Sequence, residues 1–154
     1  MKRKTRKLLD RARESLILGV EVFNRPSDNG RVEGVLLTMN HAFEMLLKAV
    51  VFEKTGRIRA KHDKYNYGFE RCIGLCQTQL STLDENEALS LRNLNGFRDA
   101  AAHDLVDISE GLLYAHVEQA VLIFGALLKR VFNKELATWL PHRILPLSTS
   151  LPRE

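Results

Sequence analysis

The chain has 154 residues, 45% hydrophobic and 27% charged, which is typical of one globular domain and argues against a disordered chain. Its formal net charge of +4 is unevenly placed, because residues 1–14 hold seven cations and two anions. We expect no membrane-spanning helix, since no apolar run reaches roughly 18 residues. The apolar stretch at residues 16–20 is too short for a signal peptide, so we expect a cytoplasmic protein.

Helical spacing of apolar residues and the absence of proline between residues 27 and 140 predict an all-helical chain. The predicted helices span 3–24, 31–55, 68–80 and 84–102, and a last one opens at Asp107 or Ser109. The second of these is the most apolar, so we expect it to be the central and most buried helix. Residues 57–67 are polar and are predicted to form a loop.

Local signals support these boundaries. Asp84 followed by Glu87 resembles a capping box, and Gly56 suits a helix C-terminus. We therefore predict an all-α bundle of four long helices plus one short helix over residues 1–138. Residues 139–154 hold three prolines and are predicted to be a tail, or a linker to an additional C-terminal domain.

The two cysteines, Cys72 and Cys76, are four residues apart, so both lie on one face of the predicted short helix. The spacing fits neither a C-x-x-C redox motif nor a disulfide framework. Only His62 lies near them as a further metal ligand, and zinc requires four. We interpret both as buried packing residues and predict no metal site.

The most informative segment is the end of the fourth predicted helix. Arg92, Asn95, Asp99 and His103 are spaced by three, four and four residues, which places them on one helical face. Asp99 can therefore orient or charge the His103 imidazole, and the long side chain of Arg98 can swing toward the same face. Three alanines, residues 100–102, leave room there for a second helix or a ligand.

The simpler interpretation of this face is a solvated helix surface with an exposed Asp–His pair. Spacing alone is weak evidence, because Arg57 and His62 repeat the Arg-to-His spacing within the predicted loop. A second polar pair, Glu44 and Lys48, lies one turn apart on the apolar central helix. It is either an internal ion pair or a support that positions Arg98.

Arg98-Asp99-x-x-x-His103 at the end of a bundle helix resembles the motif of the HEPN superfamily (higher eukaryotes and prokaryotes nucleotide-binding). Glu44-x-x-x-Lys48-Ala49 is similar to a pattern found on the central helix of that family. Together the two stretches look like an uncharacterised group of bacterial HEPN-like domains. The likeness in helix order covers roughly residues 5–135.

The resemblance implies a metal-independent endoribonuclease of the toxin or anti-phage type, with RNA, such as tRNA, as substrate and no cofactor. It further implies a homodimer, an antitoxin as partner, and products with 2′,3′-cyclic phosphate ends. His103 would be the general acid or base and Arg98 would neutralise phosphate charge. Asp99 would orient one of them, and Glu44, Lys48 and Asn95 would support the site.

Two other functions remain open at this point. The first is a non-catalytic helical module for dimerisation or for binding a partner protein, a nucleotide or RNA. The second is a helix over residues 1–24 that lies on a membrane surface, which rests on charge alone.

Overall fold

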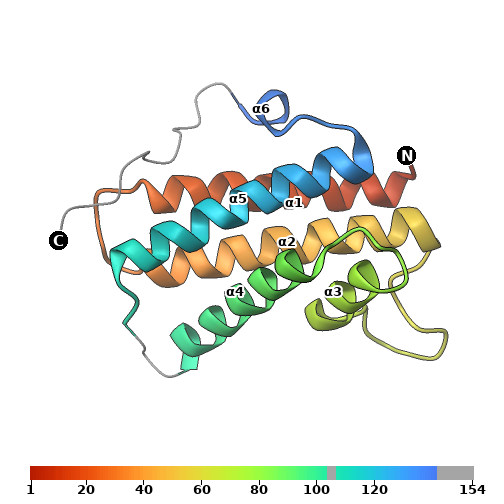
Figure 1. The fold of residues 1–154 in the computed structure, drawn as a ribbon, viewed down its shortest axis with the longest axis horizontal. Helices are drawn as coiled ribbons and strands as arrows, with labels where there is room; N and C mark the ends of the chain where they lie inside the picture. The colour runs from red at the N-terminus through yellow and green to blue at the C-terminus, as the bar shows by residue number, and fades with distance from the viewer. Residues whose placement is uncertain (104–106, 142–154) are drawn as a thin grey trace.

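The computed structural model describes residues 1–103 and 107–141, and every regular element within them is a helix (Figure 1). The elements are α1 (Arg3–Phe23), α2 (Arg31–Thr55), α3 (Phe69–Gln77), α4 (Glu85–His103), α5 (Glu110–Phe132) and α6 (Leu136–Trp139). The predicted all-α bundle is confirmed, and α2 has the predicted bounds. The single turn α6 was not predicted, because four residues carry no helical periodicity.

The helices α1 and α2 run antiparallel side by side along the long axis of the molecule (Figure 1). Their close approach depends on Gly19, since a Cβ there would lie 2.9 Å from both Met39 Cε and Thr38 Oγ1. The chain reverses at Gly30, whose φ of 65° is a left-handed conformation that favours glycine. The hairpin is therefore set by two glycines as well as by its apolar stripe.

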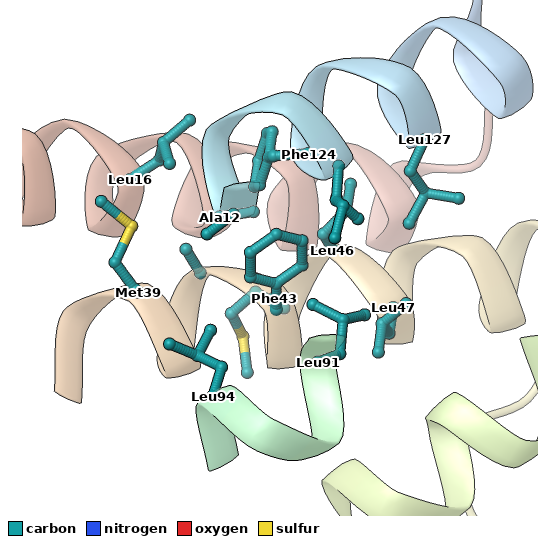
Figure 2. Packing of buried hydrophobic residues seen from close by; sticks show 14 of the residues in the cluster. Ala12, Leu16, Met39, Phe43, Leu46, Leu47, Leu91, Leu94, Phe124 and Leu127 are labelled. Carbon is teal, nitrogen blue, oxygen red and sulfur yellow. The ribbon is translucent and has the colours of Figure 1, made fainter. Parts of the chain in front are cut away.

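The core is centred on α2, as its apolar sequence predicts. Phe43 of α2 lies between Phe124 of α5 and Leu91 of α4 (Figure 2). The two phenylalanine rings meet edge to face at a centroid distance of 5.6 Å. All three side chains are buried, and α2 contacts α1, α3, α4 and α5. This makes α2 the scaffold against which the other helices are oriented.

The beginning of α4 is held by several polar contacts. The capping box is confirmed: Glu87 N donates to Asp84 Oδ1 at 2.7 Å, and Asp84 N donates to Glu87 Oε1 at 3.0 Å. The buried Glu87 also accepts from both terminal nitrogens of Arg130, which ties α4 to α5. Arg92 extends the attachment by donating to Glu70 and Gln77 of α3.

The beginning of α5 is held by a second set of polar contacts. Ser109 is its N-cap and accepts from Leu112 N at 3.2 Å, which confirms one of the two predicted starts. The buried Arg31 donates to both oxygens of Glu110 at 2.7 Å and to the carbonyl of Phe23 at 2.8 Å. This contact joins the starts of α2 and α5.

Two predicted boundaries differ from the structure. The short helix α3 ends at Gln77 instead of residue 80, because Leu80 N and Thr82 N turn back to carbonyls of α3. Trp139, placed in the predicted tail, stacks on Phe124 at a centroid distance of 5.9 Å. Residues 142–154 of that tail lie outside the described residues.

Two helices have the length and composition of membrane spans, although the sequence was expected to contain none. They are α2 and α5, with mean hydropathies of 1.4 and 1.5 over their most apolar windows. The earlier expectation counted uninterrupted apolar runs, and these windows tolerate a few charges. In the structure 72% of the α2 window and 44% of the α5 window is buried, as core helices also are.

Candidate functional site

The C-terminal half of α4 carries the Arg-Asp-His motif on a helix that is only partly packed. Arg98 is half-buried, and its Nη1 donates to Asp99 Oδ1 at 2.8 Å. The Nε of Arg98 is buried and has no hydrogen-bond partner among the described residues. An unpaired buried donor costs about 1–3 kcal/mol, and the Nε of Arg13 in α1 is in the same state.

His103 is the last residue of α4 and is exposed. In the described part of the chain no hydrogen bond or ion pair joins it to Asp99, which engages Arg98. Asp99 was expected to orient either Arg98 or His103, and in the structure it accepts a hydrogen bond from Arg98. Asn95 lies half-buried one turn before Arg98. Arg92, expected on the same face, is drawn toward α3 by Glu70.

The polar pair on α2 is present as predicted. Lys48 Nζ lies 2.8 Å from Glu44 Oε1, with the lysine side chain 10% and the glutamate 30% exposed. Both charges act on the thiol of Cys72, which locates the pair on the side of α2 that faces α3. Within the described residues no hydrogen bond or ion pair links them to Arg98, and the contact they do show is an internal ion pair.

A groove between α4 and α5 was not predicted from the sequence. It begins as a hollow of about 320 Å³ lined by Leu91, Leu94 and Leu112 among others. A second hollow of about 450 Å³, lined by Gly96, Phe97 and Ala100, continues it. Both share Asn93 and His116. Small residues on the outer side of α4 were the signal that could have indicated it.

His116 lines both hollows of this groove. Its ring lies 4.5 Å from the Phe97 ring, edge to face. Burial lowers the pKa of His116 below its ordinary 6.5. Its contact with Phe97 makes His116 a packing residue of the groove wall.

The cysteines are packing residues, as predicted. Both are buried free thiols, and burial raises the pKa of Cys72 to about 12 and that of Cys76 to about 11. Neither thiol is therefore a nucleophile at neutral pH. Over residues 1–103 and 107–141, no group of three or more His, Cys, Asp or Glu side chains is placed to hold a metal ion.

The fold and the site define a helical bundle with a partly buried Arg-Asp pair and an exposed histidine on one helix. The chain belongs to the DUF3644 family, described as a domain of unknown function, whose model matches residues 7–154. No curated protein and no solved structure matches it. The match covers α2 and α4 in full, so both polar pairs lie inside the family's region.

Proposed function

We propose that the protein is a metal-independent endoribonuclease of the HEPN type, cytoplasmic and homodimeric, belonging to the toxin or anti-phage class. The observation that carries this proposal is the state of Arg98. Its guanidinium is oriented by Asp99, and its side chain stays 39% exposed and therefore accessible to a ligand. A cation held in this way is suited to a phosphate, which takes bidentate hydrogen bonds from arginine.

The chemistry requires only groups of this kind. The RNA 2′-hydroxyl loses its proton to a base and attacks the adjacent phosphorus, and the 5′-oxygen of the next nucleotide leaves and takes a proton. The products are a 2′,3′-cyclic phosphate and a 5′-hydroxyl. His103 serves as the base or the acid, since an imidazole titrates near neutral pH. Arg98 stabilises the charge that builds on the phosphate oxygens.

A homodimer supplies the second motif histidine that one chain lacks. The reaction needs a base and an acid, and each chain brings one motif histidine, His103. Two copies related by a twofold axis bring two Arg98–His103 sets into one cleft. The exposed end of α4 and the adjoining groove leave α4 open to such an approach. An antitoxin would bind the same surface if the protein is a toxin.

The test compares the purified protein with His103→Ala and the matched control His41→Ala, which removes an exposed histidine from α2. Each protein is incubated with mixed tRNA and structured RNA in EDTA, and product ends are analysed for cyclic phosphate. We expect His103→Ala to cut at least about 100-fold more slowly, as for loss of a general acid or base. The control should cut at the wild-type rate.

Two results would overturn the proposal. Equal cleavage by wild type and His103→Ala would remove the histidine from the chemistry. Absence of cleavage by all three proteins, each folded and dimeric, would reject the ribonuclease and favour a binding module.

The groove between α4 and α5 favours that second candidate, a non-catalytic module that binds a partner helix. Gly96 lines the second hollow and a Cβ added there meets no atom within 4 Å, so Gly96→Trp is a substitution that places a large side chain at the groove. Gly74→Trp in α3 is the control, since Gly74 also has open space. If the groove is a surface for dimerisation, only Gly96→Trp changes the molecular mass measured by light scattering.

A further inference from the structure

A second basic region lies at the opposite end of the molecule from His103. Residues 54–71 contain six Lys or Arg and two acidic residues. Residues 1–14 contain seven Lys or Arg and two acidic residues. The rest of the chain then carries ten cations and fifteen anions, a net of −5. The protein is therefore strongly polarised, with its positive charge concentrated in two segments.

The structure brings these two segments together. Lys2 Nζ donates to the carbonyls of Phe52 and Glu53 at the end of α2, and Lys4 Nζ lies 5.3 Å from the Phe52 ring. The start of α1 and the loop after α2 therefore meet at one end of the bundle (Figure 1). Six residues that line hollows there form what we call the basic face: Lys4, Arg57, Arg59, Lys64, Tyr65 and Arg71.

The loop that carries most of the basic face is anchored to the bundle. Ile58 is buried, and its carbonyl accepts from Tyr67 N at 2.7 Å. Three hollows of about 290, 190 and 320 Å³ follow the loop. Arg57 and Arg71 each line two of them, so the hollows form one continuous track.

The charges of the basic face have no anionic partner in the described part of the fold, although Lys4, Lys64 and Arg71 lie near aromatic rings. Within the described residues none of these cations forms an ion pair, whereas Glu70, the acid nearest Arg71 in sequence, is engaged by Arg92. The first turn of α1 holds no acidic residue, and cations at a helix N-terminus oppose the helix dipole. Positive charge that no carboxylate within the described residues neutralises favours an anionic ligand.

Aromatic rings are interleaved with this charge. Tyr65 is 75% exposed, and Lys64 Nζ lies 5.7 Å from its ring. Arg71 lies 4.5 Å from the Tyr67 ring. Grooves that combine cations with exposed aromatic rings bind single-stranded nucleic acid, because the cations contact phosphates and the rings stack on bases.

We propose that the basic face binds single-stranded RNA and is a separate anchoring surface for the substrate. The choice of RNA rests on the proposed ribonuclease function. The axial distance along α4 from Arg92, which touches α3, to His103 is about 16 Å. A substrate held at both places therefore spans several nucleotides, which makes long RNA a better substrate than a dinucleotide.

An anionic membrane fits this face less well. Insertion into a bilayer surface requires exposed apolar side chains beside the charges. The apolar stripe of α1 is buried against α2, including Leu8, Leu9 and Leu16. Among the described residues, Met1 and Tyr65 are the large apolar side chains exposed near the basic face, whereas the exposed Leu18 lies about 21 Å along the helix from Lys4.

The test measures binding of a fluorescent 20-nucleotide 2′-O-methyl oligouridylate, which has no free 2′-hydroxyl and stays intact. The triple variant Arg57→Gln/Arg59→Gln/Lys64→Gln should bind about tenfold or more weakly, with a salt slope smaller by about 2. The control Arg25→Gln/Lys129→Gln/Lys134→Gln removes equal charge elsewhere, together with the exposed Lys129–Glu135 ion pair and a contact of Arg25 within the α1–α2 turn, and should bind as wild type does once it is shown to be folded. Tyr65→Ala should weaken binding about tenfold, and Tyr65→Phe should restore it.

Equal weakening by the triple variant and its control would overturn the proposal, since net charge alone would then explain binding. So would binding to phosphatidylserine vesicles that depends on these residues while RNA binding does not. The two proposals fail separately. RNA that binds through the basic face and is never cut rejects the ribonuclease only. Cleavage of long RNA with an unchanged KM in the triple variant rejects the basic face only.

Discussion

The two halves of α4 differ in how they are held. The first half, from Glu85 to Arg92, is tied to the α3–α4 loop by a capping box, to α5 by Arg130 and to α3 by Glu70. The second half buries only Leu94 and Ala101 fully, and it carries Arg98, Asp99 and His103. One continuous helix thus has an anchored half and a half presented to solvent.

This difference separates stability from chemistry. A residue in the first half has partners inside the fold, so its loss should destabilise the protein and leave the catalytic step of the folded fraction unchanged. A residue in the second half has few partners, so its loss should remove activity with little effect on unfolding. The following variants test that separation.

Arg98→Ala should have the largest effect. Removal of a group that stabilises developing phosphate charge should lower the rate of RNA cleavage by about 10²–10³. Arg98→Lys should recover only part of this, because lysine cannot donate in a bidentate fork. Arg92→Ala in the anchored half should cleave normally, with a stability loss of about 1 kcal/mol or less from its partly exposed ion pair. Normal cleavage by Arg98→Ala would refute the assignment.

Leu91→Ala tests the anchored half. Leu91 is 1% exposed, and truncation of a buried leucine costs about 2–5 kcal/mol. Leu89→Ala is the control on the same helix, since Leu89 is 55% exposed, and it should unfold at nearly the wild-type urea concentration. Equal stability of the two variants would contradict the packing of α4 against α2.

Glu87→Ala removes the reciprocal cap and the partner of Arg130 together. We expect a loss of about 1–2 kcal/mol, most of it from the cap, because the Arg130 side chain is 42% exposed and its ion pair is partly solvated. This loss of stability is measured by thermal unfolding of Glu87→Ala and of the neighbouring control Glu85→Ala. A melting temperature that falls equally in both variants would show that the capping box contributes nothing of its own.

The smallest expected effect is a change in folding stability at acidic pH. The hydrogen bonds from Arg31 hold the pKa of Glu110 below its ordinary 4.5. A carboxyl with a lowered folded pKa stabilises the protein above its unfolded pKa and loses that effect as the pH falls through the folded value. The stability difference between wild type and Glu110→Gln, measured by urea unfolding, should therefore be present at pH 7 and shrink below about pH 4. A difference independent of pH would contradict the ion pair.

Much of the fold could be predicted because its signals are local. The predicted 31–55 is the observed α2, the predicted 3–24 differs from α1 by one residue, and the Asp84–Glu87 box forms as expected. Such features depend on residues three or four apart, which share a helical face whatever the rest of the chain does. The paired Glu44 and Lys48 were predictable for the same reason.

The features that could not be predicted from the sequence depend on which helices become neighbours. Periodicity shows that a face is buried, but it does not identify the helix that covers it. The attachment of Arg92 to Glu70 joins residues 22 apart, and the groove around His116 needs α4 and α5 side by side. The motif residues were located on the correct helix, but Asp99 was left with two possible partners until the structure showed Arg98.

The contact between Arg31 and Glu110 has a consequence for the order of folding. It joins residues 79 apart, whereas α1 and α2 meet across a short turn. Contacts close in sequence lose less chain entropy when they form, so we expect the α1–α2 hairpin to assemble early and this ion pair to close late. An Arg31 variant should then unfold faster while refolding at the normal rate. The Arg31–Glu110 ion pair would therefore form after the helices have packed, and it would slow the unfolding of the completed bundle.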